Sequence, residues 1–285
     1  MRLATSPASQ RGRRIGPTQT IDITVPAPPI AIQTLSLRQP LRRALETAAQ
    51  LGADGVEIDL RTELRIADFS QTALRQFRKT LDDLGLRVLA ASFPTRRGFD
   101  DADDLERRVL ATREAMAFAY KLGAHVVIGR AGEIPEGDDA PLADIMVQSL
   151  QLLGSHGERV GARFAFASGA APKAQRRLLD RIGEGVVGVA LHPALLIGGG
   201  HEPADAASQL GADALCIYAV DAVREASVSG SRATEVQLGR GEADMPAVLG
   251  VLEEHAFRGP VTVTRTDTSD PTGEISDAVQ FLRAL

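Results

Sequence analysis

The sequence of 285 residues contains one cysteine, no tryptophan and only 4% aromatic residues. Because Cys216 is alone, a disulfide framework and a paired-cysteine metal site are both excluded. No stretch approaches the ~18 consecutive apolar residues that a membrane-spanning helix needs. Arginines at positions 2, 11, 13 and 14 also interrupt the amino-terminal segment, which therefore lacks the apolar centre of a secretory signal. We expect a cytoplasmic protein that does not enter a membrane.

Acidic residues outnumber basic residues in most of the chain. The formal net charge is −5, which argues against a general nucleic-acid-binding surface. Residues 1–29 are the exception, because they hold four arginines against Asp22, a balance of +3 that leaves −8 for residues 30–285. Such a segment can contact nucleic acid or an acidic partner, but its Ser, Gln and Pro content favours a solvated, disordered leader. We therefore divide the chain into a leader, residues 1–29, and a single domain, residues 30–285, with no nucleic-acid partner.

The domain contains eight short apolar runs that are predicted to be strands. Each run is apolar along most of its length, which is typical of parallel strands that are buried on both faces. The predicted strands are 30–34, 55–60, 87–93, 125–130, 163–168, 186–192, 215–220 and 260–265.

Segments with apolar residues at three- and four-residue spacing separate these runs, and this spacing predicts helices. Gly85 and Gly123 follow two of these segments and are expected to end the helices. Strict alternation of strand and helix implies a parallel sheet with right-handed crossovers. Eight such units predict an α/β protein with a closed (β/α)8 TIM barrel, which typically uses ~250 residues. An open doubly wound sheet is the alternative, but no GxGxxG motif follows the first run.

In a barrel of this kind, chemistry takes place at the carboxyl ends of the strands and in the loops that follow them. Polar residues at those ends are therefore candidates for a site. They are Glu57, Asp59, Ser92, Arg96, Arg130, Ser168, His192, His201, Tyr218, Asp221, Thr264, Arg265 and Asp267.

Several segments resemble a known family. They are GADGVEID (52–59), LHPALLIGGGHEP (191–203), YAVDAVRE (218–225), LGRGEADMPAVLGVLEEHAFRGPVTV (238–263) and the closing DAVQFLRAL. Together they are similar to the xylose isomerase-like barrels, and more narrowly to bacterial sugar-phosphate isomerase/epimerase proteins. The resemblance covers about residues 30–285 and implies a small, sugar-like ligand.

The resemblance also implies where a metal would be held. In that family a divalent cation, often Mn²⁺ or Mg²⁺, is bound by a Glu, an Asp, a His and a Glu at the ends of strands 5, 6, 7 and 8. Placed on this chain, these positions are Ala167, His192, Tyr218 and Thr264. A hard cation needs several carboxylate or carbonyl oxygens, and one imidazole does not replace them. We therefore expect no metal cofactor and a dismantled metal site.

The remaining polar residues can be assigned roles in a metal-free pocket. The catalytic candidates are His192, Glu57 and Tyr218, and the substrate-binding candidates are Arg130, His201, Asp221, Arg240 and Arg265. Several of them have a structural alternative. His192 can simply be hydrogen-bonded at a strand end, and Arg240 can pair with Glu242 on the surface. Glu57 and Asp59 alternate with Val56 and Ile58 and so share one face of their strand, which can point into the barrel mouth, but a salt bridge with a neighbouring arginine explains them equally well. His201 follows Gly198–Gly200, which is either an anion-binding nest of N–H groups or a flexible loop.

Three hypotheses of function follow. The first is a family member without metal catalysis that binds a sugar-like molecule, or that regulates or scaffolds an active relative. The second is an isomerase or epimerase that works without a metal, and the third is a metal-independent hydrolase or lyase in the same pocket. The sequence is compatible with a homo-oligomer but does not define one.

Overall fold

The computed structural model describes residues 27–136, 144–227 and 230–285, so nearly all of the predicted leader lies outside the described residues. Eight parallel strands close into a barrel in the order β1-β10-β7-β6-β5-β4-β3-β2, which confirms the predicted fold class. Seven of the predicted runs contain one of these strands, and the run 215–220 overlaps β7, which begins one residue earlier. The barrel strands are β1 (Ile30–Gln33), β2 (Gly55–Asp59), β3 (Arg87–Ser92), β4 (Val126–Gly129), β5 (Arg163–Phe166), β6 (Gly188–Leu191), β7 (Ala214–Ala219) and β10 (Val261–Val263).

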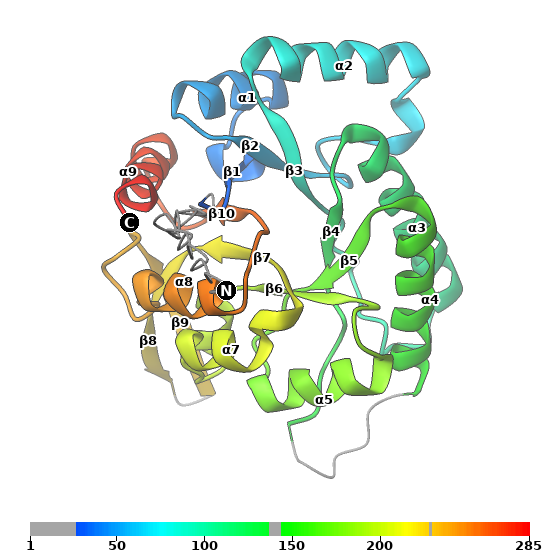
Figure 1. Cartoon of the computed structure of the whole chain (residues 1–285), viewed down its shortest axis with the longest axis vertical. Helices are drawn as coiled ribbons and strands as arrows, with labels where there is room; N and C mark the ends of the chain where they lie inside the picture. Colours follow the sequence, from blue (N-terminus) through cyan, green and yellow to red (C-terminus); the bar gives the residue numbers. More distant parts are fainter. Residues whose placement is uncertain (1–26, 137–143, 228–229) are drawn as a thin grey trace, which may run out of the picture.

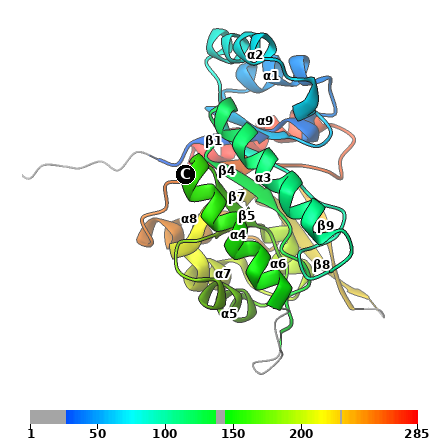
Figure 2. The same cartoon turned by 90° about the vertical axis from the view of Figure 1, so that its right-hand side faces the viewer.

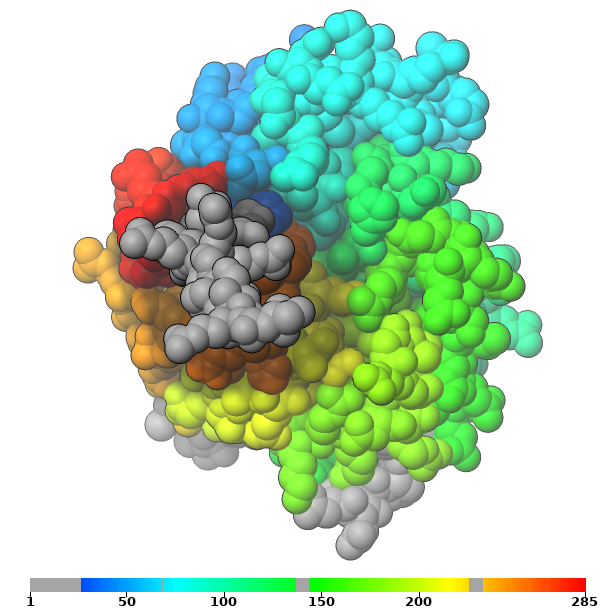
Figure 3. All heavy atoms as spheres, in the orientation of Figure 1, coloured from blue at the N-terminus to red at the C-terminus, as the bar shows by residue number. Residues whose placement is uncertain are grey.

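Helices surround the barrel as an outer layer (Figure 1). The space-filling view in the same orientation shows this layer as the outer ring of the molecule (Figure 3). None of the helices in the described ranges is long and apolar enough to cross a lipid bilayer. The helices are α1 (Leu41–Gln50), α2 (Gln71–Leu84), α3 (Leu105–Leu122), α4 (Asp144–Val160), α5 (Pro172–Ile182), α6 (Pro193–Gly198), α7 (Pro203–Leu210), α8 (Met245–Glu254) and α9 (Pro271–Arg283).

Two of the predicted helix ends are confirmed. Gly85 and Gly123 follow α2 and α3 with φ angles of 68° and 97°, the left-handed region that glycine adopts without steric cost. At the other end of α2, the Ser70 hydroxyl accepts a hydrogen bond from the Ala73 N–H group. These local signals set the lengths of the crossovers, and so the places where the chain returns to the barrel.

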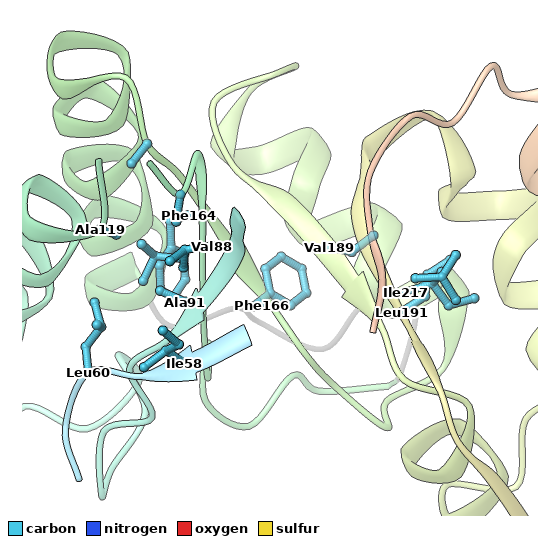
Figure 4. Packing of buried hydrophobic residues seen from close by; sticks show 14 of the residues in the cluster. Ile58, Leu60, Val88, Ala91, Ala119, Phe164, Phe166, Val189, Leu191 and Ile217 are labelled. Atoms are coloured by element: carbon cyan, nitrogen blue, oxygen red, sulfur yellow. The ribbon is translucent and has the colours of Figure 1, made fainter. Parts of the chain in front are cut away.

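The strands bury two different faces. Their outward side chains, among them Ile58, Phe164, Phe166 and Ile217, belong to the main core, and Figure 4 shows them from close by. Their inward side chains form a second buried cluster, in which the alanines Ala90, Ala165 and Ala190 lie beside Val126, Ile128, Cys216, Tyr218 and Val220. Small residues at alternate positions leave room for polar side chains that point inward from the strand ends. Cys216 is fully buried, and burial raises the pKa of its thiol, as expected for a core residue.

The long connection after β7 holds structure that the sequence pattern did not predict. It forms an antiparallel hairpin of β8 (Asp221–Ser227) and β9 (Gly230–Val236). The hairpin contacts α6, a short helix that was also not predicted, and Figure 2 shows these elements together. Because the hairpin lies outside the barrel, its strands lack the continuous apolar runs that identified the other eight.

Candidate functional site

Glu57 lies inside the barrel near the carboxyl end of β2. Its neighbours in the strand, Val56 and Ile58, belong to the outer core, so Glu57 and Asp59 share the inward face as predicted. Glu57 is fully buried. Its Oε1 atom accepts hydrogen bonds from the Gln33 amide at 3.0 Å and from the Tyr218 hydroxyl at 3.1 Å. The Oε2 atom is buried and has no hydrogen-bond partner among the described residues.

This environment favours the neutral form of the carboxyl group. Burial raises the pKa of Glu57 to about 7, and the nearby charge of Asp59 adds to this. Hydrogen bonds from the side chains of Gln33, Tyr218 and Ser92 act in the opposite direction, because they favour the ionised form. Burial also raises the pKa of the Tyr218 hydroxyl well above its ordinary value, and the nearby Glu57 adds to this. Tyr218 therefore stays protonated and donates to Glu57 throughout the physiological range. The pair can hold or release one proton near neutral pH.

His192 follows β6 and stacks on Tyr218. The two ring centroids are 4.7 Å apart, with an interplanar angle of 41°. The Nδ1 atom of His192 accepts a long hydrogen bond, 3.4 Å, from the N–H group of Leu195 and so caps α6. Because Nδ1 accepts, the proton of the neutral ring is on Nε2. Burial lowers the pKa of His192 to about 4, so the ring is neutral at pH 7.

The substitution His192→Asn tests this assignment, because an asparagine can also accept at a helix N-cap. The pKa of His192 is lower in the folded state, so the wild type loses stability as pH falls through 6.5 towards 4. The variant should lack this loss, which we expect to be about 1–2 kcal/mol because the residue is partly exposed. Urea unfolding of both proteins at pH 4.5 and pH 7.5 measures this loss of stability. If wild type and His192→Asn lose equally, His192 is not a buried, neutral helix cap.

Gln33, at the end of β1, connects Glu57 to the end of β10. Its Oε1 atom accepts hydrogen bonds from the hydroxyls of Ser36 and Thr264, both at 2.9 Å. These two hydroxyl oxygens are 3.0 Å apart, so the three oxygens lie within hydrogen-bond distance of one another. The side chains of Thr264, Ser36, Gln33, Glu57 and Tyr218 therefore form one hydrogen-bonded network across the barrel mouth. Gln33 and Ser36 were not predicted as site residues, because neither belongs to a motif.

The four positions at which the family holds a metal do not form a ligand set. Ala167 follows β5 and has no donor atom, and the Thr264 hydroxyl is bound to Gln33 and Ser36. His192 uses Nδ1 as a helix cap, and Tyr218 donates to Glu57. Within the described ranges, no group of three or more His, Cys, Asp or Glu side chains is arranged to hold a metal ion. The residues present therefore do not fit a divalent cation.

Among the described residues, neither Glu57 nor Asp59 forms the salt bridge with a neighbouring arginine that was their structural alternative. Asp59 Oδ1 accepts from the N–H groups of Arg61 and Thr62 and from the Thr62 hydroxyl, so it shapes the turn after β2. Glu63 Oε2 accepts from the Asp59 N–H group and from the Thr34 hydroxyl. Both acids therefore support the loop that follows β2.

Asp221, a predicted substrate-binding residue, is buried beneath the loop of residues 239–243. Its Oδ1 atom accepts from the N–H groups of Ala222 and Ala243, both at 2.9 Å. Its Oδ2 atom accepts from the N–H groups of Gly239 and Gly241 at 3.0 and 2.8 Å. With four backbone donors on one carboxylate, this geometry gives Asp221 a structural role.

We expect Asp221→Asn to lower the free energy of unfolding by about 2–4 kcal/mol, because the new NH₂ group faces backbone N–H donors and leaves them unpaired. Urea denaturation at pH 7 measures the loss. Asp244→Asn is the matched control, since Asp244 is exposed and asparagine also caps a helix. Equal stability of the two variants would show that the loop does not depend on Asp221.

Arg265, another predicted binding residue, is engaged by two carboxylates. Its Nε atom donates to Glu274 at 2.6 Å, and its Nη1 atom lies 3.2 Å from Glu235 of β9. Burial alone would raise the pKa of Glu235, but hydrogen bonds from Thr266, Asp267 and Arg265 lower it. Arg265 therefore ties the β8–β9 hairpin to the end of β10.

The other predicted binding residues lie apart from the network of Glu57. Arg130 and Arg240 are exposed in loops, and His201 is 3.4 Å from Glu136. The N–H groups of Gly199, Gly200 and His201 donate to carbonyls of α6, so they do not converge on an anion as a nest would. The nest interpretation of this segment was therefore wrong.

The comparisons with known proteins agree with this architecture. A family model described as "Xylose isomerase-like TIM barrel" matches residues 45–285. No curated protein sequence matches the chain.

Solved structures share the fold at low sequence identity. A xylose isomerase domain protein from Planctomyces limnophilus has a TM-score of 0.77 and 23% identity, and the alignment covers 91% of this chain and 97% of that one. A xylose isomerase-like TIM barrel protein from Mycobacterium smegmatis, in complex with magnesium, has a TM-score of 0.72, 15% identity and coverages of 89% and 95%. A sugar phosphate isomerase/epimerase from Parabacteroides distasonis has a TM-score of 0.69, 15% identity and coverages of 95% and 98%. The chain belongs to the xylose isomerase-like TIM barrel family.

Proposed function

We propose that this member of the sugar isomerase/epimerase superfamily binds a sugar-like small molecule at the barrel mouth without divalent-metal chemistry. It would act as a binding protein, or as a regulatory or scaffolding relative of an active isomerase. One observation carries the proposal. Tyr218 stands where the family has a ligating histidine, and its hydroxyl donates to the buried Glu57.

The chemistry of the mouth supports both parts of the proposal. A metal-dependent isomerase needs a cation to stabilise the developing oxyanion and carboxylates to move the proton. Ala167 and Thr264 supply no carboxylate at the two glutamate positions. Amide and hydroxyl groups such as those of Gln33, Ser92 and Ser168 remain at the strand ends, and their donors and acceptors are suited to sugar hydroxyls.

A second candidate is proton transfer without a metal, in an isomerase or epimerase or in a hydrolase or lyase. The unpartnered Oε2 atom of the buried Glu57 favours it, because the most effective general base has a pKa near the working pH. Glu57 would take or give the proton, and Tyr218 would stabilise the ionised carboxylate by donating to Oε1. His192 would donate from Nε2 to a substrate oxygen.

Calorimetric titration with a panel of pentoses, hexoses and their phosphates, with and without EDTA, tests the proposal. We expect at least one compound to bind with the same affinity in both conditions. Binding that requires Mn²⁺ or Mg²⁺, or no binding at all, would contradict it. NMR of the same mixtures separates the two candidates, since a product that wild type forms in EDTA and Glu57→Gln does not would establish metal-free catalysis.

A further inference from the structure

The edge of the barrel that commonly binds anions is already occupied by the chain's own carboxylates. In many TIM barrels a phosphate is held by the loops after the last two barrel strands, here β7 and β10. In this chain Asp221 accepts from four backbone N–H groups in that region. Arg265, at the end of β10, is paired with Glu235 and Glu274. The four N–H groups around Asp221 and the guanidinium of Arg265 are therefore engaged, whereas Arg240 is exposed.

The opposite edge of the mouth carries three arginines, one after each of the neighbouring strands β2, β3 and β4. The strand order places β3 across the barrel from β7, and β4 across from β10. The three residues are Arg61, Arg96 and Arg130, and all are exposed. We call them the arginine edge. Within the described residues none of their guanidinium groups has a carboxylate within 4.0 Å, whereas Arg97 is paired with both Asp101 and Asp103.

Backbone contacts bring the three loops together. Arg61 Nη1 donates to the carbonyl of Pro94 at 2.7 Å, which places its guanidinium on the loop after β3. That loop runs beside the end of β4, since Phe93 N–H donates to the Ile128 carbonyl at 2.8 Å. Phe99 N–H likewise donates to the Ala131 carbonyl at 2.6 Å. Arg96 lies between these two contacts on the loop after β3, and Arg130 lies between them on the loop after β4.

Two of the acidic side chains near this edge are turned towards the backbone, whereas Glu133 is exposed. Asp59 Oδ1 accepts from the N–H groups of Arg61 and Thr62. Asp100 Oδ2 accepts from the N–H group of Glu133. Three like charges on neighbouring loops repel one another, and a bound anion would relieve this repulsion.

We propose that the ligand of this barrel carries an anionic group, a phosphate or a carboxylate, that binds at the arginine edge while its hydroxylated part faces Gln33 and Thr264. The inference rests on the proposed function, because it places the same ligand in the same mouth. Guanidinium groups suit both anions, since their planar N–H pairs match two oxygens of a phosphate or carboxylate. The site differs from the common phosphate site of TIM barrels in lying on the opposite side of the mouth.

Paired ligands that differ only in charge test the inference. Calorimetry would compare D-fructose 6-phosphate with D-fructose, and D-gluconate with D-glucitol, so that the phosphate and the carboxylate are separate arms. We expect the anionic member of at least one pair to bind at least roughly tenfold more tightly, with an advantage that shrinks as NaCl screens it. Arg96→Gln with Arg130→Gln should remove most of this advantage and weaken the binding of the neutral member far less.

The matched control is Arg75→Gln with Arg107→Gln, which removes the same charge from exposed positions on α2 and α3. It should retain the advantage of the anionic ligand. If the control loses as much as the arginine-edge variant, only the net charge matters and the inference is wrong. If the neutral sugars bind and their anionic partners bind no better, the inference fails while the proposed function stands. If none of the four compounds binds, both are contradicted for these ligands.

Discussion

Replacing Glu57 with glutamine is expected to raise the free energy of unfolding by about 3 kcal/mol at pH 8 and to leave it unchanged at pH 4. The folded-state pKa of Glu57 is about 7, above its ordinary value of 4.5. Between these two values the folded protein binds more protons than the unfolded chain, so stability falls as pH rises. Above pH 7 the loss is complete. Glutamine resembles the protonated carboxyl and cannot ionise, so the variant escapes the loss.

Urea unfolding of wild type and variant from pH 4 to pH 8 measures this effect as a difference between two curves. Glu254→Gln is the control, because Glu254 is exposed on α8. It should follow the wild-type curve. Parallel curves for Glu57→Gln and wild type would mean that the pKa of Glu57 is the same in the folded and the unfolded state, and its assignment as a proton-holding group would be wrong.

His192 acts in the opposite direction over much of the same range. Its pKa is lowered to about 4, so its contribution to stability grows as pH rises from 4 to 6.5. In the wild type the two effects oppose each other. The Glu57→Gln variant should therefore become more stable with rising pH, and His192→Asn should become less stable. The two variants retain all other titrating residues. Opposite changes in the slope of the free energy of unfolding against pH therefore identify Glu57 and His192 as the groups responsible.

Restoring the family ligands should create a metal site where the wild type has none. The variant carries Ala167→Glu, His192→Asp, Tyr218→His and Thr264→Glu together. Without metal it should melt below the wild type, because Glu57 loses the Tyr218 donor and three new carboxylates repel one another. A ligand that binds only the folded state stabilises it by about 2.7 kcal/mol at a hundred times its Kd. For a chain of this size, Mn²⁺ should then raise the Tm by about 5 °C or more.

A variant with the last three substitutions but with Ala167 retained is the control. It lacks one glutamate and should gain much less from Mn²⁺, because partial sites bind hard cations weakly. EDTA should reverse the gain of the complete variant. If the complete variant folds but millimolar Mn²⁺ does not raise its Tm, the ends of β5, β6, β7 and β10 do not converge as the family pattern requires.

The barrel strands could be predicted from the sequence because parallel strands covered on both faces are almost continuously apolar. The run at 163–168 is an example, since Phe164 and Phe166 pack outward while Ala165 faces the lumen. The alternation of Val56, Glu57, Ile58 and Asp59 likewise predicted an inward carboxylate. The hairpin of β8 and β9 escaped prediction because it packs on α6, outside the barrel core.

The contacts of the site could not be predicted, since they depend on which distant side chains meet. Gln33 joins Glu57, 24 residues away, to Thr264, 231 residues away. No local pattern marks such a residue. The contacts of Asp221 could not be predicted either. Its position after β7 suggested a binding role, and only the fold reveals that its carboxylate accepts hydrogen bonds from four backbone N–H groups.

The metal content of the wild-type protein tests the central claim most directly. Protein purified without chelators and dialysed would be analysed for Mn, Mg, Co and Zn, and its Tm measured with and without millimolar Mn²⁺. The replacement of three of the four family ligands by Ala167, Tyr218 and Thr264 predicts metal far below one equivalent and no change in Tm. A stoichiometric metal that survives dialysis, or a Tm raised by Mn²⁺ and lowered again by EDTA, would contradict the account of a barrel that works without a metal.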